Sequence, residues 1–161
     1  MIMRDASVIK KDRMRYTNNK LSSTLAILAI VFDALYFVSI YSSDVNQYYY
    51  TYDMGLSVVY NLLFLLFAFL CSEGIKNYNN TYAYGIIALG VLQIPRIFYI
   101  PMRAHSAVEV VEGVEQLVMS DGQFAYVVVL LCLSAIAAVA SGIIGIYKTS
   151  VLRAYNRSLE Q

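Results

Sequence analysis

The stretch Leu89–His105 reads LGVLQIPRIFYIPMRAH, and it combines a lipid-compatible run with residues that lipid excludes. Gln93, Pro95 and Arg96 interrupt the apolar run, and Pro101 follows a few residues later. An ionised side chain at the centre of a bilayer costs at least about 2.5–3.5 kcal/mol, so such residues face the protein interior and pair with one another. The stretch therefore predicts a spanning helix that contributes to a polar centre inside a bundle.

Composition restricts the class of protein. Hydrophobic residues make up 59% of the 161 residues and charged residues only 14%, with a mean hydropathy of +0.57. Soluble domains carry about 25% charged residues, so this chain lacks the polar surface to cover a globule in water. No basic patch is interleaved with aromatic residues on a soluble element, so we expect no nucleic-acid partner. The composition predicts a multi-pass protein whose main partner is the lipid bilayer.

Four apolar segments have the length that a spanning helix needs, which is about 20 residues. They run over about 21–41, 54–72, 82–101 and 124–147. Because the connections are short, neighbouring spans should run antiparallel. The expected fold is an all-α integral membrane protein with a four-span bundle over 21–147, a basic N-terminal segment over 1–20 and a basic tail over 148–161.

The distribution of Lys and Arg predicts the orientation of the chain. Six of the 12 lie in segment 1–20 and three follow residue 147, whereas the connection between the first two spans has none. Loops rich in Lys and Arg stay in the cytoplasm. We therefore expect both termini in the cytoplasm and the protein in the plasma membrane of a prokaryotic cell.

The outer connection over 106–119 carries a helix-like pattern. Apolar residues recur at Val108, Val111, Val114, Leu117 and Val118. Acidic residues take other positions, at Glu109, Glu112 and Glu115. This spacing predicts an amphipathic helix on the outer surface. It would cover the mouth of the bundle, gather cations at an acidic rim, or form a docking face for another protein.

Polar residues from all four spans are expected at one depth. At 1.5 Å of rise per residue, Arg96 lies roughly 21 Å and Asp33 roughly 18 Å from the cytoplasmic starts of their spans. Asn61 lies roughly 11 Å below the outer surface, and Gln93 and Ser134 fall nearby. In a hydrocarbon core about 30 Å thick, these positions form a single layer. The sequence therefore predicts an intramembrane polar network.

The role of this network stays open from sequence. An Asp33–Arg96 pair would fix the register of the helices, or the layer would form an ion or substrate site. In a third arrangement, Arg96 reaches the outer interface and leaves Asp33 to pair with Asn61. Pro95 removes one backbone hydrogen bond, which would free a carbonyl near Val91 for the same layer.

The last span carries small residues at every fourth position. One row contains Ser134, Ala138 and Gly142, and a second contains Ala137, Ser141 and Gly145. Such rows let helix backbones approach closely. They predict a packing surface, either toward the other spans of this chain or toward another membrane subunit.

No recognisable chemistry accompanies these features. Cys71 and Cys132 fall at different depths, too far apart for a disulfide, and read as small packing residues. His105 is the single histidine, without neighbouring metal ligands at useful spacing, and no catalytic motif is present. We expect no enzyme activity, no cofactor and no metal.

These observations favour a non-catalytic subunit of a larger membrane complex. Such a subunit would bind and stabilise or regulate a transporter, for example an ATP-driven importer, or it would associate with copies of itself. The alternative is a small homo-oligomeric ion-coupled transporter or channel that uses Asp33 within the bilayer.

Overall fold

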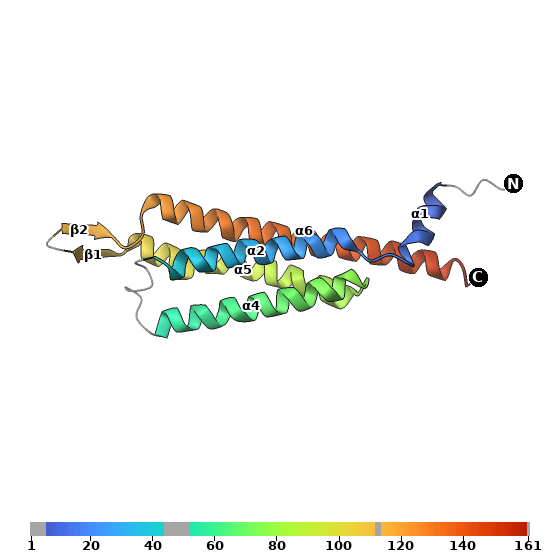
Figure 1. Ribbon diagram of the computed structural model, residues 1–161, viewed down its shortest axis with the longest axis horizontal. Coiled ribbons are helices and arrows are strands. Elements are labelled where there is room, and N and C mark those ends of the chain that lie inside the picture. Colours follow the sequence, from blue (N-terminus) through green and yellow to red (C-terminus); the bar gives the residue numbers. More distant parts are fainter. Residues whose placement is uncertain (1–5, 44–51, 112–113, 161) are drawn as a thin grey trace.

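The computed structural model describes residues 6–43, 52–111 and 114–160, and this part of the chain is nearly all helical (Figure 1). The long helices are α2 (Lys20–Tyr41), α4 (Tyr52–Lys76), α5 (Asn80–Ser106) and α6 (Asp121–Arg157). A short helix α1 (Ala6–Met14) precedes them. All four long helices are long and apolar enough to cross a membrane, which confirms the predicted multi-pass class.

The four long helices form a ring. Both α2 and α5 pack against α4 and α6. Figure 1 accordingly shows α4 and α6 on opposite edges of the bundle with α2 and α5 between them. Consequently α2 and α5 lie on one diagonal of the ring, and α4 and α6 lie on the other. Side chains from diagonal helices can meet only at the centre.

Two apolar clusters fill the interior, one toward each end. The cluster near the connection between α5 and α6 uses large side chains, including Tyr36, Ile100, Met119 and Leu131. The cluster toward α1 is rich in alanine and includes Ala26, Ala29, Ala68 and Ala138. Small side chains of this kind let neighbouring helices approach closely.

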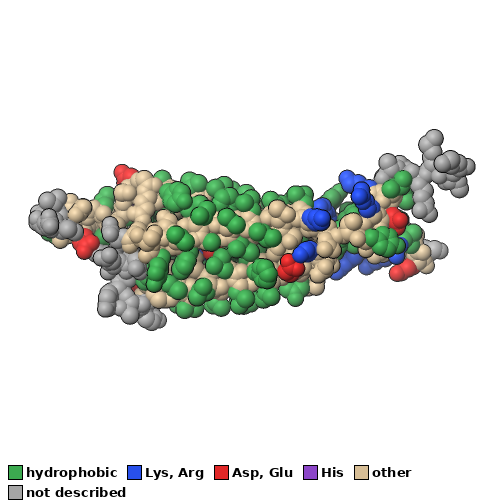
Figure 2. All heavy atoms as spheres, viewed as in Figure 1, with side chains coloured by type: hydrophobic (Ala, Val, Ile, Leu, Met, Phe, Trp, Pro, Cys, Tyr) green, Lys and Arg blue, Asp and Glu red, His purple; other side chains and the backbone are tan. Residues whose placement is uncertain are grey.

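The face of the ring seen in Figure 2 is apolar along most of its length. Leu, Val, Ile and Phe side chains on all four helices are exposed, for example Val38, Leu66, Phe98 and Ile136. A soluble monomer rarely exposes a contiguous apolar surface of this extent. In a bilayer the same surface contacts lipid tails, so the outward faces agree with a membrane location.

The predicted outer helix over 106–119 is wrong. This connection contains an antiparallel hairpin of β1 (Val108–Val111) and β2 (Val114–Leu117). Valine is β-branched and stiff at χ1, so it favours a strand over a helix. Residues 108–110 also alternate between Val and Glu, which is the two-residue period of a strand, although valines spaced by three fit a helix as well.

Several helix ends also lie beyond the predicted span limits, most clearly the last residues of α5 and α6. Helix α5 continues through Pro95 and Pro101 to Ser106, and α6 continues past Tyr147 to Arg157. Spanning helices tolerate proline where neighbouring groups satisfy the freed carbonyl. In α6 the apolar run ends at Tyr147, but Lys, Arg, Leu and Ala are good helix formers and extend the helix into the tail.

Candidate functional site

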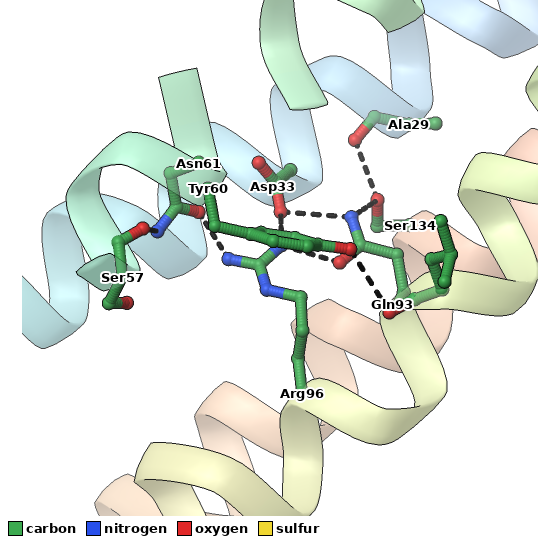
Figure 3. Close-up of polar contacts among 9 residues, drawn as sticks. Ala29, Asp33, Ser57, Tyr60, Asn61, Gln93, Arg96 and Ser134 are labelled. Atoms are coloured by element: carbon green, nitrogen blue, oxygen red, sulfur yellow. Dashed lines mark hydrogen bonds and ion pairs between the residues drawn. The ribbon is translucent and has the colours of Figure 1, made fainter. Parts of the chain in front are cut away.

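A polar network occupies the centre of the ring, between the two apolar clusters (Figure 3). Helix α2 supplies Asp33, α4 supplies Asn61, α5 supplies Gln93 and Arg96, and α6 supplies Ser134. The structure thus brings together all five residues of the predicted polar layer. Asp33, Gln93 and Ser134 have no exposed surface, and Arg96 is 9% exposed.

The guanidinium of Arg96 joins three of the four helices. Its Nη1 donates to Asp33 Oδ1 and to Gln93 Oε1, and its Nη2 donates to Asn61 Oδ1. Hydrogen bonds between a guanidinium and a carboxylate are roughly twice as strong as neutral ones. The attraction between the two side chains therefore offsets part of the free-energy cost of removing both charges from water.

Gln93 extends the network to α6. Its Nε2 donates to Asp33 Oδ1 at 2.9 Å and to Ser134 Oγ at 3.3 Å. Ser134 Oγ in turn donates to the Ala29 carbonyl oxygen at 2.9 Å, which returns the chain of bonds to α2. Every helix of the ring is thereby held to the same level.

Two tyrosines complete the surroundings of Arg96. The Cζ atom of Arg96 lies 4.7 Å from the centre of the Tyr36 ring and 4.8 Å from that of the Tyr60 ring. Both distances fit cation–π contacts. The sequence interpretation missed both residues. Tyr36 lies three positions after Asp33 and therefore on the same helix face, which was the available signal.

Tyr60 also bonds to the backbone of α5 near Pro95. Its hydroxyl donates to the Leu92 carbonyl oxygen at 3.2 Å. The sequence predicted a free carbonyl near Val91, and the carbonyl that accepts from a side chain is the next one along α5. The Tyr60 hydrogen bond therefore ties α4 to α5 beside Pro95, but its acceptor is not the Val91 carbonyl that Pro95 frees.

Arg96 points inward, so the arrangement in which it reaches the outer interface does not occur here. Asn61 does not replace it as a donor to Asp33, because Asn61 Nδ2 donates to the Ser57 carbonyl oxygen at 2.8 Å. One carboxylate oxygen is left over. Within residues 6–43, 52–111 and 114–160, no group donates to the buried Asp33 Oδ2.

A pocket of about 370 Å³ lies beside the network, mainly between α4 and α5. Its lining combines Arg96 with three tyrosines, three apolar residues and one serine, namely Tyr36, Tyr60, Tyr99, Leu56, Leu92, Pro95 and Ser57. Arg96 therefore borders both the Asp33 carboxylate and a space large enough for a small amphiphile.

The small residues of α6 pack inside this chain. Ser134, Ala138, Ser141, Gly142 and Gly145 are all buried. A Cβ atom on Gly142 would lie 2.3 Å from Ile87 Cγ1 and 2.6 Å from the Ala83 carbonyl oxygen, so this row lies directly against α5. Ser141 Oγ donates to the Ser22 carbonyl oxygen at 2.7 Å, which ties the second row to α2. These rows are packing surfaces within this chain, and a contact with another subunit stays a prediction.

The remaining candidate groups lie apart from the network. Glu109 and Glu115 are exposed on the hairpin, and Glu112 lies outside the described residues. Cys71 and Cys132 are both free thiols, as predicted, but only Cys71 is buried, so the prediction that Cys132 is a packing residue is wrong. In the part of the chain that the structure describes, no three His, Cys, Asp or Glu side chains lie close enough to hold a metal ion.

Comparison with known proteins found no matching family model, no matching curated protein and no matching solved structure.

Proposed function

We propose that this chain is a non-catalytic membrane subunit that docks on a larger membrane complex and stabilises or regulates it. The observation that supports this proposal is the β1–β2 hairpin, which projects beyond the end of the helix ring (Figure 1). In this proposal the chain acts through contacts rather than through chemistry of its own.

The hairpin has the properties of a docking element. Val108 pairs with Leu117, and Val110 lies two residues beyond Val108, so these three apolar side chains share one face. Val108 is 51% exposed and Val110 is 64% exposed. An isolated two-stranded sheet is marginally stable in water, and its unpaired edges can accept a further strand. A partner that covers the apolar face or adds a strand would stabilise the hairpin.

The orientation that we propose places the hairpin outside the cell. Lys and Arg side chains gather at one end of the molecule (Figure 2), which is the end that carries α1, whereas the hairpin lies at the opposite end (Figure 1). By the positive-inside rule, the α1 end faces the cytoplasm. The docking partner would then present an outer surface beside this subunit, as an integral complex such as an ATP-driven importer can.

A groove along the ring offers a second contact within the membrane. It lies between α5 and α6, has a volume of about 350 Å³, and is lined by residues that include Gly90, Ala135, Val139 and Ala140. Small side chains at a membrane-facing surface let a neighbouring helix approach closely. A spanning helix of the host complex would fit this groove.

Copurification tests the proposal. The tagged chain is extracted in mild detergent from cells that produce it natively, and its partners are identified by mass spectrometry. Val108→Ser with Val110→Ser should lose the partner. Val31→Ser with Val38→Ser is the matched control, since these exposed valines lie on α2 and should leave the partner bound. Retention of the same partner by the hairpin variant would overturn the proposal.

One observation favours a second candidate, an ion-coupled transporter or channel. Asp33 Oδ2 is buried without a donor among the described residues, and Arg96 links the carboxylate to a pocket. Such a carboxylate can take up a proton or cation during transport. Purified protein in proteoliposomes with a pH- or sodium-sensitive dye should then show flux that Asp33→Asn removes. An absence of flux from the unaltered protein excludes this candidate.

A further inference from the structure

A basic pocket of about 260 Å³ lies between α1 and α6, at the end of the bundle away from the hairpin. Lys10, Lys11 and Lys148 line one part of it. Met14, Tyr147 and Val151 supply an apolar part. The two helices are distant in sequence, so the pocket exists only because α1 folds back onto α6.

The three lysines are not neutralised within the described chain. Arg15 approaches Asp12 at 3.9 Å, but no carboxylate of the described residues forms an ion pair with Lys10, Lys11 or Lys148. Lys148 Nζ donates to Asn19 Oδ1 at 3.0 Å, a neutral acceptor that fixes its position without cancelling its charge. Three ammonium groups around one pocket repel one another unless an anion lies between them.

The position of the pocket indicates the kind of anion. Between Asp121 and Lys148, α6 carries no charged residue, so Lys148 marks the level at which the apolar surface ends. The adjacent Tyr147 is exposed, as tyrosines at a membrane–water boundary are. A ligand at this level would place a negative group among the lysines and an apolar part against Tyr147 and Val151.

We propose that this pocket binds the headgroup phosphate of an anionic phospholipid, with α1 lying over the headgroup. Basic pockets at the ends of spanning helices bind lipid phosphates in this way. The apolar side of the pocket favours a lipid over a free phosphate ion, because a soluble anion has nothing to place there. The inference does not depend on the docking role of the hairpin.

Native mass spectrometry of the full chain in mild detergent tests the site. The protein is titrated with phosphatidylglycerol or with phosphatidylcholine, and the bound lipid is counted. The unaltered protein should prefer phosphatidylglycerol. Each lysine near a membrane surface contributes about fivefold in affinity, so Lys10→Gln with Lys11→Gln should weaken phosphatidylglycerol binding by about 30-fold.

The matched control is Arg153→Gln with Arg157→Gln, which removes the same charge from exposed positions outside the pocket. It should bind phosphatidylglycerol as the unaltered protein does. The single variants Lys10→Gln and Lys11→Gln, each with about a fivefold loss, serve if the double variant does not fold. A thermal unfolding curve for each variant separates loss of the site from loss of structure.

Three results would overturn the proposal. The two lipids would bind the unaltered protein equally, or the control would lose as much affinity as the pocket variant. In the third, inorganic phosphate at the concentration of the lipid would displace phosphatidylglycerol fully, which would make the pocket a site for a soluble anion.

Discussion

Asp33 and Arg96 meet across a diagonal of the helix ring, although they are 63 residues apart in sequence. Their helices, α2 and α5, pack on the same two neighbours, α4 and α6. The ion pair, with the Gln93–Asp33 hydrogen bond and the Arg96–Tyr36 ring contact, links α2 directly to α5 at the centre of the ring. Its loss should affect the whole ring rather than one interface.

Single changes at this pair should destabilise the protein. Asp33→Asn leaves the Arg96 charge uncompensated, and Arg96→Gln does the same to Asp33. Breaking a buried pair from one side costs about 3–5 kcal/mol, whereas replacing both partners is often nearly neutral. We expect each single variant to unfold at lower denaturant concentration in detergent, and Asp33→Asn with Arg96→Gln to recover much of the loss.

The double variant also separates the two roles of the layer. Recovery of both folding and partner binding or flux supports a structural pair that fixes helix register. Recovery of folding without activity supports a functional ion or proton site. If neither single change alters stability, the two side chains do not depend on each other.

Two substitutions at Tyr60 should separate the stability that its hydroxyl contributes from the stability that its ring contributes. Tyr60→Phe removes the hydrogen bond to the Leu92 carbonyl and should cost about 0.5–1.5 kcal/mol of unfolding free energy. Tyr60→Leu also removes the ring that lies over Arg96 and should cost a further ~0.5–2 kcal/mol. Equal stability of the two variants would show that the ring contributes nothing beyond its hydroxyl.

Packing of α6 against α5 should be sensitive to a single methyl group. Gly142→Ala places a Cβ atom 2.3 Å from Ile87 Cγ1, so the helices must separate or Ile87 must move. Overpacking of this kind costs about 1–3 kcal/mol. Gly122→Ala is the control, because no atom lies within 4 Å of its Cβ position. A thermal shift for Gly142→Ala no larger than for the control would contradict the tight contact.

The proposed orientation can be measured by labelling in intact cells. Cys71→Ala with Cys132→Ala removes both native thiols, after which Glu115→Cys and Ser158→Cys are introduced separately. Both positions are exposed, on the hairpin and beyond α6 respectively. A membrane-impermeant maleimide should label Glu115→Cys and leave Ser158→Cys unlabelled until the cells are opened. The reverse pattern means that the hairpin faces the cytoplasm.

Hydropathy and the rise per residue were sufficient to predict the four helices and the meeting of the five polar residues at one level of the bundle. Asp33 and Arg96 are conspicuous because a charged side chain in lipid needs a partner of opposite charge. The rise of about 1.5 Å per residue gives the expected position of each residue along its helix. The same reasoning could not identify Tyr36 and Tyr60 as neighbours of Arg96. A tyrosine in a span reads equally well as an interfacial anchor.

The hairpin was missed for a different reason. Valines spaced by three positions fit a helical pattern. The connection is too short for the helical period of about 3.6 residues to be distinguished from the strand period of about 2 residues. Two Val-rich runs separated by Glu112 and Gly113 are also a hairpin signal. The β-branched side chains were the better guide, since an exposed helix gains little from valine.

The diagonal ion pair also has a consequence for how the protein is made. Chains are synthesised from the N-terminus, and Arg96 follows Asp33 by 63 residues. Helix α2 therefore reaches the membrane before Arg96 has been synthesised. Until α5 is inserted, the Asp33 carboxylate lacks its counter-ion, and an unpaired charge in lipid is unfavourable in free energy. We expect a chain truncated at Asn79 to integrate α2 less efficiently than the full chain, in a glycosylation-mapping assay, and Asp33→Leu to abolish that difference. Biogenesis of this membrane protein would then depend on an insertion machinery that retains α2 until α5 joins it.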